Sequence, residues 1–379
     1  MTDHDYMKRA IELAKRGSGW TNPNPLVGAV IVKHGKIIGE GWHARYGELH
    51  AERNAIHSLT ESAEGATLYV TLEPCCHYGK TPPCTEAILE QKIARVVIGS
   101  RDPNPQVSGK GAAILREAGV NVSEDFMREE CDRLNPVFFH FITEGTPYVV
   151  MKYAMTADGK IATQTGASKW ITGEAARKKV QELRWTYMGI MCGIGTVLAD
   201  DPLLTVREAG RRNPIRIICD SLLRLPENSK ICQTAREYPV IAACAAEAAE
   251  KAPGYEQKKR RLEALGVRVL PVPHSPEHVN LRELMKLLGE AKIDSILLEG
   301  GGVLNNSALR SGIVQEVKGF IAPKLFGGGG KTPVEGNGVN FPDEAVLMEL
   351  EEVSAIDRDL MISWRVRDPG KEQLCSQAL

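Results

Sequence analysis

The chain has 379 residues, of which 43% are hydrophobic and 25% charged, and its formal net charge is −1. This length exceeds one typical hydrophobic core and predicts two domains. The near-zero charge gives no electrostatic reason to expect nucleic acid or an anionic membrane as a partner, and no apolar run is long enough to span a bilayer. Nine cysteines at irregular spacing do not resemble a disulfide framework, and residues 1–16 lack the apolar segment of a secretory signal. We therefore expect a cytoplasmic protein.

The first part of the chain predicts helices that alternate with strands. Apolar spacing and turn residues predict helices at 6–15, 51–59, 85–91 and 112–118, and a last, interrupted helix at 126–142. Alternating or continuous apolar runs predict strands at 27–33, 36–40, 67–72, 94–99 and 120–122. This order is typical of a three-layer α/β sandwich.

A polar stretch at 143–147 predicts a linker, after which the α/β pattern restarts. We expect domains at 1–145 and 146–368, followed by a polar tail at 369–379. Within the second domain, strands are predicted at 148–154, 188–192, 215–219, 240–243, 267–270, 295–298 and 317–322. Helices are predicted at 174–185, 258–265, 281–288 and after the glycines 300–302. This second unit is long enough to hold its own core.

The most distinctive motif combines a histidine, a glutamate and two cysteines. His50 and Glu52 are separated by one residue, Cys75 follows a proline, and eight residues separate Cys75 from Cys84. Zinc deaminases that act on bases carry the related signature H-x-E…P-C-x-x-C, with a shorter cysteine spacing. One imidazole and two thiolates leave the fourth position of a tetrahedral zinc open for water. Glu52 is not needed as a ligand and is predicted to carry protons to the ring nitrogen and the leaving amine.

A structural zinc is the alternative interpretation of these residues. Such a site takes four protein ligands, and Cys76 or His77 could supply the fourth. Neighbouring side chains such as those of Cys75 and Cys76 point in different directions, which argues against both binding one ion. The free Glu52 favours the catalytic interpretation.

Several motifs resemble the bifunctional riboflavin-biosynthesis deaminase/reductase family. In the first domain the similar stretches are Asn22–Gly28, Gly47–Glu52, Thr71–Cys75, Thr81–Cys84 and Asp102–Pro105. In the second domain they are Asp158–Ala162, Ser168–Thr172, Gly193–Val197, Ala199–Pro202 and Glu299–Gly301. The long cysteine spacing is the form that this family uses, whereas Cys76 stands where the family often has a small polar residue.

The resemblance implies a cytidine-deaminase-like N-terminal domain and a dihydrofolate-reductase-like C-terminal domain. It implies deamination of 2,5-diamino-6-ribosylamino-4(3H)-pyrimidinone 5′-phosphate, followed by NADPH-dependent reduction to 5-amino-6-(5-phospho-D-ribitylamino)uracil. By this resemblance the zinc ligands are His50, Cys75 and Cys84. The implied contacts to the pyrimidine substrate are Asn24, His43, His77, Lys80, Asp102 and Asn104. For His43 a hydrogen bond at a strand end is the alternative role.

In the second domain, the resemblance implies contacts to NADP and to the ribotide. The expected NADP contacts are Ala154, Trp170, Thr196, Asp200, Ser221, Gly301, Gly302, Val303, Leu304, Asn305, Asn306 and Ser307. The expected substrate contacts are Ser168, Arg184, Leu204, Arg207 and Glu299, with Lys152 as a further polar partner near the ribose. The two arginines suit a phosphate. The alternatives are a solvated charge for Arg184, Arg207 or Lys152 and a core position for Trp170.

The glycine turn at 300–302, between a strand and a helix, is a weak sign of phosphate binding and lacks the G-x-G-x-x-G pattern. The preference for NADP over NAD therefore rests on the family, and the glycines at 327–330 have no assignable function.

Two other functions are compatible with parts of the sequence. One is a base deaminase that acts on tRNA or a free nucleoside, although the near-zero charge disfavours tRNA. The other is a nucleotide-binding or regulatory protein with a structural zinc and no turnover. The leading expectation is an enzyme whose partner is a small pyrimidine ribotide, without nucleic acid or membrane, and the resemblance implies a homo-oligomer.

Overall fold

The computed structural model describes residues 1–79, 81–104 and 107–367, and the chain divides into two compact units. The N-terminal unit comprises Met1–Gly145, and the C-terminal unit begins at Thr146. In the described part of the chain, no helix is long and apolar enough to cross a membrane.

The N-terminal unit is built on a five-stranded sheet in the order β2-β1-β3-β4-β5. Strand β1 is antiparallel to β2 and β3, whereas β3, β4 and β5 are parallel. The strands are β1 Gly28–Lys33, β2 Lys36–Trp42, β3 Thr67–Leu72, β4 Arg95–Ser100 and β5 Asn121–Ser123. Strands β3 and β4 are buried almost throughout, as expected for strands covered on both faces.

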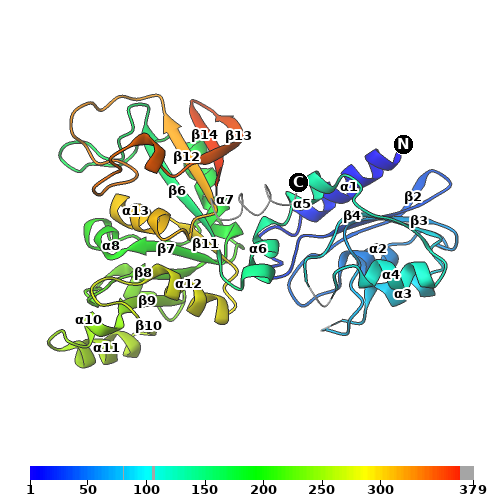
Figure 1. Cartoon of the computed structure of the whole chain (residues 1–379), viewed down its shortest axis with the longest axis horizontal. Coiled ribbons are helices and arrows are strands. Elements are labelled where there is room, and N and C mark those ends of the chain that lie inside the picture. The colour runs from blue at the N-terminus through cyan, green and yellow to red at the C-terminus, as the bar shows by residue number, and fades with distance from the viewer. Residues whose placement is uncertain (80, 105–106, 368–379) are drawn as a thin grey trace. The chain divides into compact units, whose positions relative to one another are not determined.

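Helices cover both faces of this sheet (Figure 1) and so confirm the predicted three-layer sandwich. Helices α1 (Asp3–Lys15) and α5 (Arg128–Asp132) lie on one face. On the other face lie α2 Ala51–His57, α3 Cys84–Glu90 and α4 Lys110–Glu117. The predicted last helix is two helices, because α6 (Pro136–Glu144) begins at the proline, which fits the first turn of a helix and not its interior.

The C-terminal unit contains a nine-stranded sheet in the order β10-β9-β8-β7-β11-β6-β12-β14-β13. All neighbours from β10 to β12 are parallel, and β14 and β13 add an antiparallel edge. The strands are β6 Tyr148–Thr156, β7 Gly189–Gly193, β8 Ile215–Cys219, β9 Val240–Ala245, β10 Val267–Val272, β11 Ser295–Leu298, β12 Glu316–Ala322, β13 Met348–Ile356 and β14 Asp359–Val366.

Helices accompany the parallel strands of this unit, as expected when crossover connections join them. They are α7 Glu174–Thr186, α8 Ile194–Asp200, α9 Lys230–Gln233, α10 Ala246–Ala249, α11 Tyr255–Ala264, α12 Leu281–Glu290 and α13 Gly302–Arg310, with a short 3-10 turn η1 at Pro342–Glu344. Because the strands are parallel, the segments that follow β6, β7, β8 and β11 all start at the carboxyl edge of the sheet, where ligands of open α/β sheets bind.

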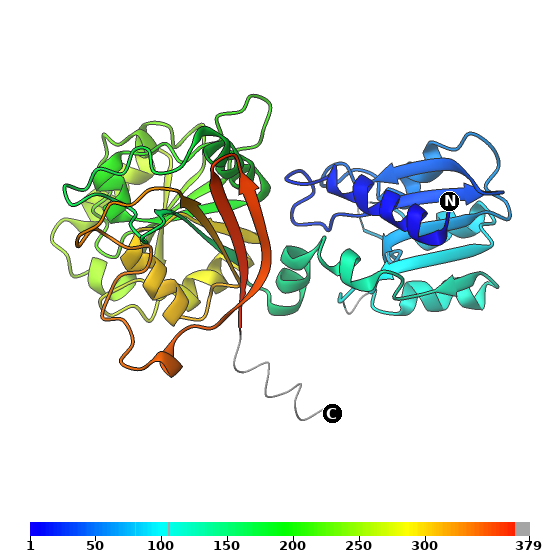
Figure 2. The same cartoon turned by 90° about the horizontal axis from the view of Figure 1, so that it is seen from above.

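The β13–β14 hairpin was not predicted from the sequence. Figure 2 shows it as the red pair of strands in the C-terminal unit. Strand β13 forms the edge of the sheet and remains largely exposed, including Leu350 and Val353. Its run of glutamates obscures the alternation that identifies a half-buried strand, and its stability comes from pairing with β14.

Candidate functional site

Three chain segments bring the metal-ligand candidates together in the N-terminal unit. His50 is the residue immediately before α2, Cys75 follows β3, and Cys84 is the first residue of α3. The backbone amides of Cys84 and Thr85 donate hydrogen bonds to the Cys75 carbonyl at 3.1 and 3.2 Å. These bonds close the loop between the cysteines, so that the long spacing still places both sulfurs at one point.

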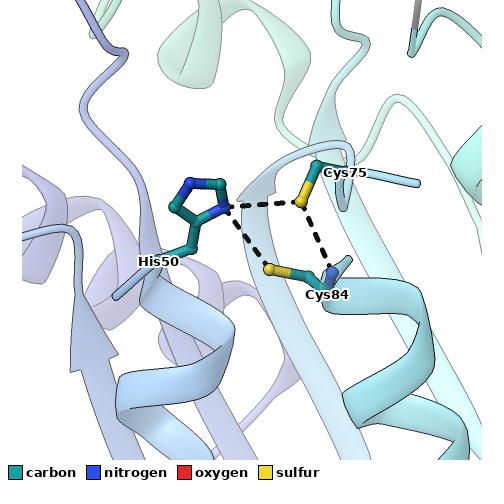
Figure 3. A group of neighbouring side chains, drawn as sticks. All are labelled: His50, Cys75 and Cys84. Carbon is teal, nitrogen blue, oxygen red and sulfur yellow. Dashed lines mark hydrogen bonds between the residues drawn. The ribbon is translucent and has the colours of Figure 1, made fainter. Parts of the chain in front are cut away.

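The spacing of the three ligand atoms fits a zinc ion. The His50 Nδ1 atom lies 3.4 Å from the Cys75 sulfur and 3.5 Å from the Cys84 sulfur (Figure 3). Tetrahedral zinc with ordinary Zn–N and Zn–S bonds places nitrogen and sulfur about 3.6 Å apart. In the described part of the chain, the metal-binding group contains neither Cys76 nor His77. This donor set favours the catalytic interpretation over a four-ligand structural site.

The electrostatic environment distinguishes the two thiols of this group, because the hydrogen bond with Cys75 and burial raise the pKa of Cys84 well above its usual value. Hydrogen bonds with Cys84 and with His50 outweigh the effect of burial and lower the pKa of the Cys75 thiol to about 4. Glu52 is only 3% exposed, and burial together with the nearby Cys75 raises the pKa of its carboxyl to about 7. The site therefore joins a thiolate to a carboxyl group that is shielded from bulk water.

A cavity of about 250 Å³ opens in front of these residues. It is lined by most of the N-terminal residues that the sequence singled out, namely Asn24, His43, His50, Glu52, Cys75, His77, Asp102 and Asn104. Cys84 is buried behind it as the third member of the metal-binding group. Lys80, the predicted phosphate contact, lies outside the described residues.

Two histidines of the cavity differ in their hydrogen bonding. His43 Nδ1 lies 3.0 Å from the Leu49 carbonyl, and its Nε2 lies 3.2 Å from the amide nitrogen of Asn24. A neutral imidazole that donates to the carbonyl and accepts from Asn24 satisfies both contacts, and burial lowers the pKa of His43 accordingly. His43 thus positions Asn24 while it lines the cavity. The buried Nδ1 of His77 has no hydrogen-bond partner among the described residues.

Sequence reasoning missed Glu73, which lies two residues before Cys75. This carboxylate is 4% exposed, lines the cavity, and accepts hydrogen bonds from the backbone amides of Gly109 at 2.9 Å and Ala112 at 3.2 Å. It caps the N-terminus of α4, whose preceding loop carries Asp102. The sequence feature that could have identified Glu73 is its position directly before Pro74 and Cys75.

Replacing Glu73 by glutamine is expected to destabilise the N-terminal unit by about 2 kcal/mol, because the NH₂ group replaces one of the two carboxylate oxygens that accept from Gly109 and Ala112. Chemical denaturation measures the change. Glu117→Gln, at the exposed far end of α4, is the control and should leave stability unchanged. Equal stability of the two variants would contradict the capping role.

The second candidate site is a cavity of about 1100 Å³ in the C-terminal unit. It is lined by Lys152, Ala154, Ser168, Trp170, Arg184, Arg207 and Glu299 of the predicted residues. Trp170 is 56% exposed and lies under the Arg177 guanidinium, 4.7 Å from the ring centroid, so a core position for Trp170 is wrong.

A buried ion network lies at the base of this cavity. Arg184 donates to both Glu299 oxygens, at 2.7 and 3.1 Å, and Lys152 Nζ lies 3.1 Å from Glu299 Oε2. Burial raises the pKa of Glu299, but the charges of Arg184 and Lys152 outweigh burial and hold it at about 2. Arg184 also donates to the Thr205 carbonyl at 3.1 Å. Neither cation is a solvated surface charge, and Arg184 already donates to both Glu299 and Thr205.

The remaining cofactor candidates do not line this cavity. Strand β7 leads through Gly193 into α8, and β11 leads through Gly301 into α13. Thr196 Oγ1 lies 3.8 Å from where a Cβ on Gly301 would be, so the two helix starts are neighbours. The N-cap residue of α13, Gly301, makes no side-chain capping hydrogen bond among the described residues, and the Glu335 side chain lies against Gly302 in the first turn. Ser221 follows β8 and Asp200 ends α8.

Two predicted contacts turn their side chains toward the protein. Asn305 is 1% exposed and donates from its amide to the Pro333 carbonyl at 2.8 Å. Its buried Oδ1 lies 2.9 Å from where a Cβ on Gly300 would be, so this glycine makes room for it. Leu204 packs in the core with a left-handed backbone (φ 54°). Any contact of Asn305 or Leu204 with a ligand would use the backbone.

Several further cavity residues were missed, among them Arg177, Lys178, Gln181 and Asp357. Arg177, Lys178 and Gln181 share a face of α7 with Arg184, and this helical spacing could have identified them. Asp357 lies in the turn of the unpredicted β13–β14 hairpin and gave no signal.

Comparisons with known proteins agree with both sites. The family described as "Cytidine and deoxycytidylate deaminase zinc-binding region" matches residues 1–100, and the one described as "RibD C-terminal domain" matches residues 147–362. The riboflavin biosynthesis protein RibD of Actinobacillus pleuropneumoniae is 53% identical over 97% of this chain and 96% of its own. RibD of Escherichia coli (strain K12) is 42% identical over 86% and 89% of the two chains.

Solved structures give the same result. Acinetobacter baumannii RibD (form 1) superposes with a TM-score of 0.85 and 36% identity, over 97% of this chain and 99% of its own. A Thermotoga maritima protein has a TM-score of 0.83, 40% identity, and coverage of 96% and 98%. It is described as a diaminohydroxyphosphoribosylaminopyrimidine deaminase/5-amino-6-(5-phosphoribosylamino)uracil reductase. With such identity over both units, the chain belongs to the RibD family of bifunctional riboflavin-biosynthesis enzymes, which join a zinc-binding deaminase domain to an NADPH-dependent reductase domain.

Proposed function

We propose that the N-terminal domain, residues 1–145, deaminates 2,5-diamino-6-ribosylamino-4(3H)-pyrimidinone 5′-phosphate. The C-terminal domain, residues 146–368, then reduces the ribosyl group of the product with NADPH and forms 5-amino-6-(5-phospho-D-ribitylamino)uracil. The proposal rests on the metal-binding group formed by His50, Cys75 and Cys84. The buried carboxylate of Glu52 lies beside this group and is not needed as a metal ligand. The description of the Thermotoga maritima protein supports the choice of substrates.

In the deaminase domain, His50, Cys75 and Cys84 would hold the zinc. Zinc bound there supplies a water that is nucleophilic near neutral pH. Glu52 would carry one proton from the attacking water to the ring nitrogen, and then a second proton from the new hydroxyl group to the amino group, which leaves as ammonia while the C=O bond forms. Its burial at the cavity wall keeps bulk water from competing for these protons.

The polar residues of the cavity wall orient the pyrimidine. Asn24, held by His43, presents its amide to the ring, and His77 lines the same cavity. Asp102 and Asn104 line the wall next to them, and Lys80 is proposed as a phosphate contact.

In the reductase domain, the network of Lys152, Arg184 and Glu299 fixes the ribosyl group. Glu299 keeps both cations in place, and Lys152 Nζ has donors left for a ribose oxygen. Ser168, Arg207 and the backbone at Leu204 complete the substrate contacts. The proposed NADPH contacts are Ala154, Trp170, Thr196, Asp200, Ser221 and residues 301–307.

Bound NADPH supplies the hydride. Of these contacts, Ala154 and Trp170 line the same cavity as Lys152 and Glu299, whereas the start of α13 suits the cofactor phosphates. The cofactor would therefore extend along the carboxyl edge of the sheet from β6 toward β8. Self-association and a cytoplasmic location remain predictions of the sequence and the family resemblance.

A coupled assay tests the proposed function. Purified protein is mixed with the diaminopyrimidine ribotide and NADPH, and ammonia and the loss of NADPH absorbance are followed together. We expect both signals, and removal of zinc by a chelator should abolish ammonia release, because hydrolysis near pH 7 needs the activated water. Reduction of already deaminated substrate should continue. Metal-free protein that released ammonia at the full rate would refute the proposed deaminase mechanism.

A further inference from the structure

Two stretches that carry no proposed contact lie together at the carboxyl edge of the C-terminal sheet. They are the turn 157–162, which follows β6, and the glycine loop 324–331, which follows β12. Because β6 and β12 are parallel neighbours, both stretches start at the same edge. Two backbone hydrogen bonds of 2.9 Å join their ends, from the amides of Ala157 and Ile161 to the carbonyls of Lys324 and Lys331, respectively.

Asp158 is the side chain that fastens the glycine loop to the turn. One of its carboxylate oxygens accepts from the Phe326 amide at 3.1 Å, and the other accepts from the Gly327 amide at 2.7 Å. The Thr156 hydroxyl donates to the first oxygen. The hydrogen bonds from Thr156 and Gly327 lower the pKa of Asp158 to about 2, so the carboxylate is ionised at neutral pH. Hydrogen bonds to an ionised acceptor are stronger than neutral ones.

The glycine loop depends on such an anchor. Its four consecutive glycines have wide conformational freedom and no side chains with which to hold the loop. Gly327 and Gly328 have left-handed backbones, with φ of 68° and 62°. A Cβ on Gly330 would lie 2.6 Å from the Ala162 carbonyl oxygen, so only glycine fits against the turn at this position.

Lys324 connects the glycine loop to the large cavity. Its Nζ atom donates to the Trp170 carbonyl at 2.8 Å. The Trp170 side chain lines the cavity, and Arg177 stacks on its ring. Because Lys324 lies two residues before Phe326, the hydrogen bonds of Asp158 also fix the backbone from which Lys324 reaches Trp170.

We propose that Asp158 and Lys324 are positioning residues of the reductase, which hold Trp170 in place as an aromatic wall for NADPH. This inference rests on the proposed contact between Trp170 and NADPH. Neither Asp158 nor Lys324 is among the described residues that line the cavity, so both act through Trp170. A ring that is already held in its bound orientation loses less conformational entropy when the ligand binds.

Calorimetric titration of the full-length protein with NADPH tests the inference. Asp158→Asn and Lys324→Met should each raise the Kd for NADPH about tenfold, because each removes charge-assisted hydrogen bonds. The KM for NADPH should rise by a similar factor, whereas the KM for the deaminated ribotide should stay unchanged. A general structural lesion would raise both. Lys324→Arg should restore NADPH binding, because it keeps a cationic donor.

A double-mutant cycle shows whether the effect passes through Trp170. Trp170→Leu removes the ring and should itself weaken NADPH binding. In this background Asp158→Asn should cause little further loss, because the contact that Asp158 positions is already gone. An effect of Asp158→Asn that had the same size in both backgrounds would overturn the inference.

Asp343→Asn and Lys331→Met are the matched controls. Both residues are exposed, lie in the same connection between β12 and β13, and form no side-chain hydrogen bond among the described contacts. They should leave NADPH binding unchanged, and an effect equal to that of Asp158→Asn and Lys324→Met would overturn the inference. Absence of any reduction by the wild-type protein would refute the proposed function instead, and the calorimetric comparison would still decide the role of Asp158. Unchanged deamination and a cooperative thermal transition show that the variants are folded.

Discussion

Glu52→Gln is expected to lower the rate of ammonia release by about 10³-fold or more, which is the contribution of a positioned general acid–base group. Glutamine keeps the shape of the side chain but cannot carry the proton. The three metal ligands are unchanged, so zinc content should match the wild type. Reduction of already deaminated substrate should stay within about twofold of the wild-type rate, since independent sites behave additively.

Glu48→Gln provides the control for this experiment. Glu48 lines the same cavity but is exposed and lies outside the proposed catalytic group. Its replacement should leave deamination close to the wild-type rate. If Glu52→Gln removed both activities equally, the assignment of the two reactions to separate domains would be wrong. If it retained zinc and full deamination, Glu52 would not be the proton carrier.

The sequence predicted most of the elements whose signal is local. Strands β3, β8 and β11 have the predicted bounds, because each is a short apolar run between turn residues. The candidate metal ligands were recognisable for a similar reason, since ligand chemistry depends on residue type and motif order. The reductase cavity also contains helix α7, whose polar face has regular spacing, and this face was overlooked although its signal is local.

Other features depend on contacts between distant residues. Arg184 and Glu299 are 115 residues apart, and only the fold shows that they neutralise each other. For that reason sequence reasoning could describe Arg184 as suited to a phosphate but could not predict its ion pair with Glu299. Glu73 and the amides that it caps are likewise 36 and 39 residues apart. The β13–β14 hairpin is stabilised by pairing at the sheet edge and not by a buried apolar face.

Glu299→Gln is expected to have the largest effect in the reductase domain. The substitution leaves Lys152 and Arg184, whose side chains are 13% and 14% exposed, without their only carboxylate partner among the described residues. Loss of one member of a buried ion network costs about 3 kcal/mol of stability. The two cations also lose their positions beside the substrate, so NADPH oxidation should fall by about 10²-fold. Glu208→Gln, an exposed carboxylate of the same cavity, should change neither quantity appreciably.

The pH dependence of this variant separates charge from packing. The folded pKa of Glu299, about 2, lies below its ordinary value, so its contribution to stability is fully present above about pH 5 and is lost as the pH falls toward 2. The difference in unfolding free energy between wild type and Glu299→Gln should therefore be largest near neutral pH and shrink on acidification. A difference that stayed constant from pH 7 to the acid limit of folding would mean that the introduced amide disrupts packing and that charge balance is not the cause. Deamination by the same variant should remain at the wild-type rate, because the described residues that line the first cavity all belong to the N-terminal unit.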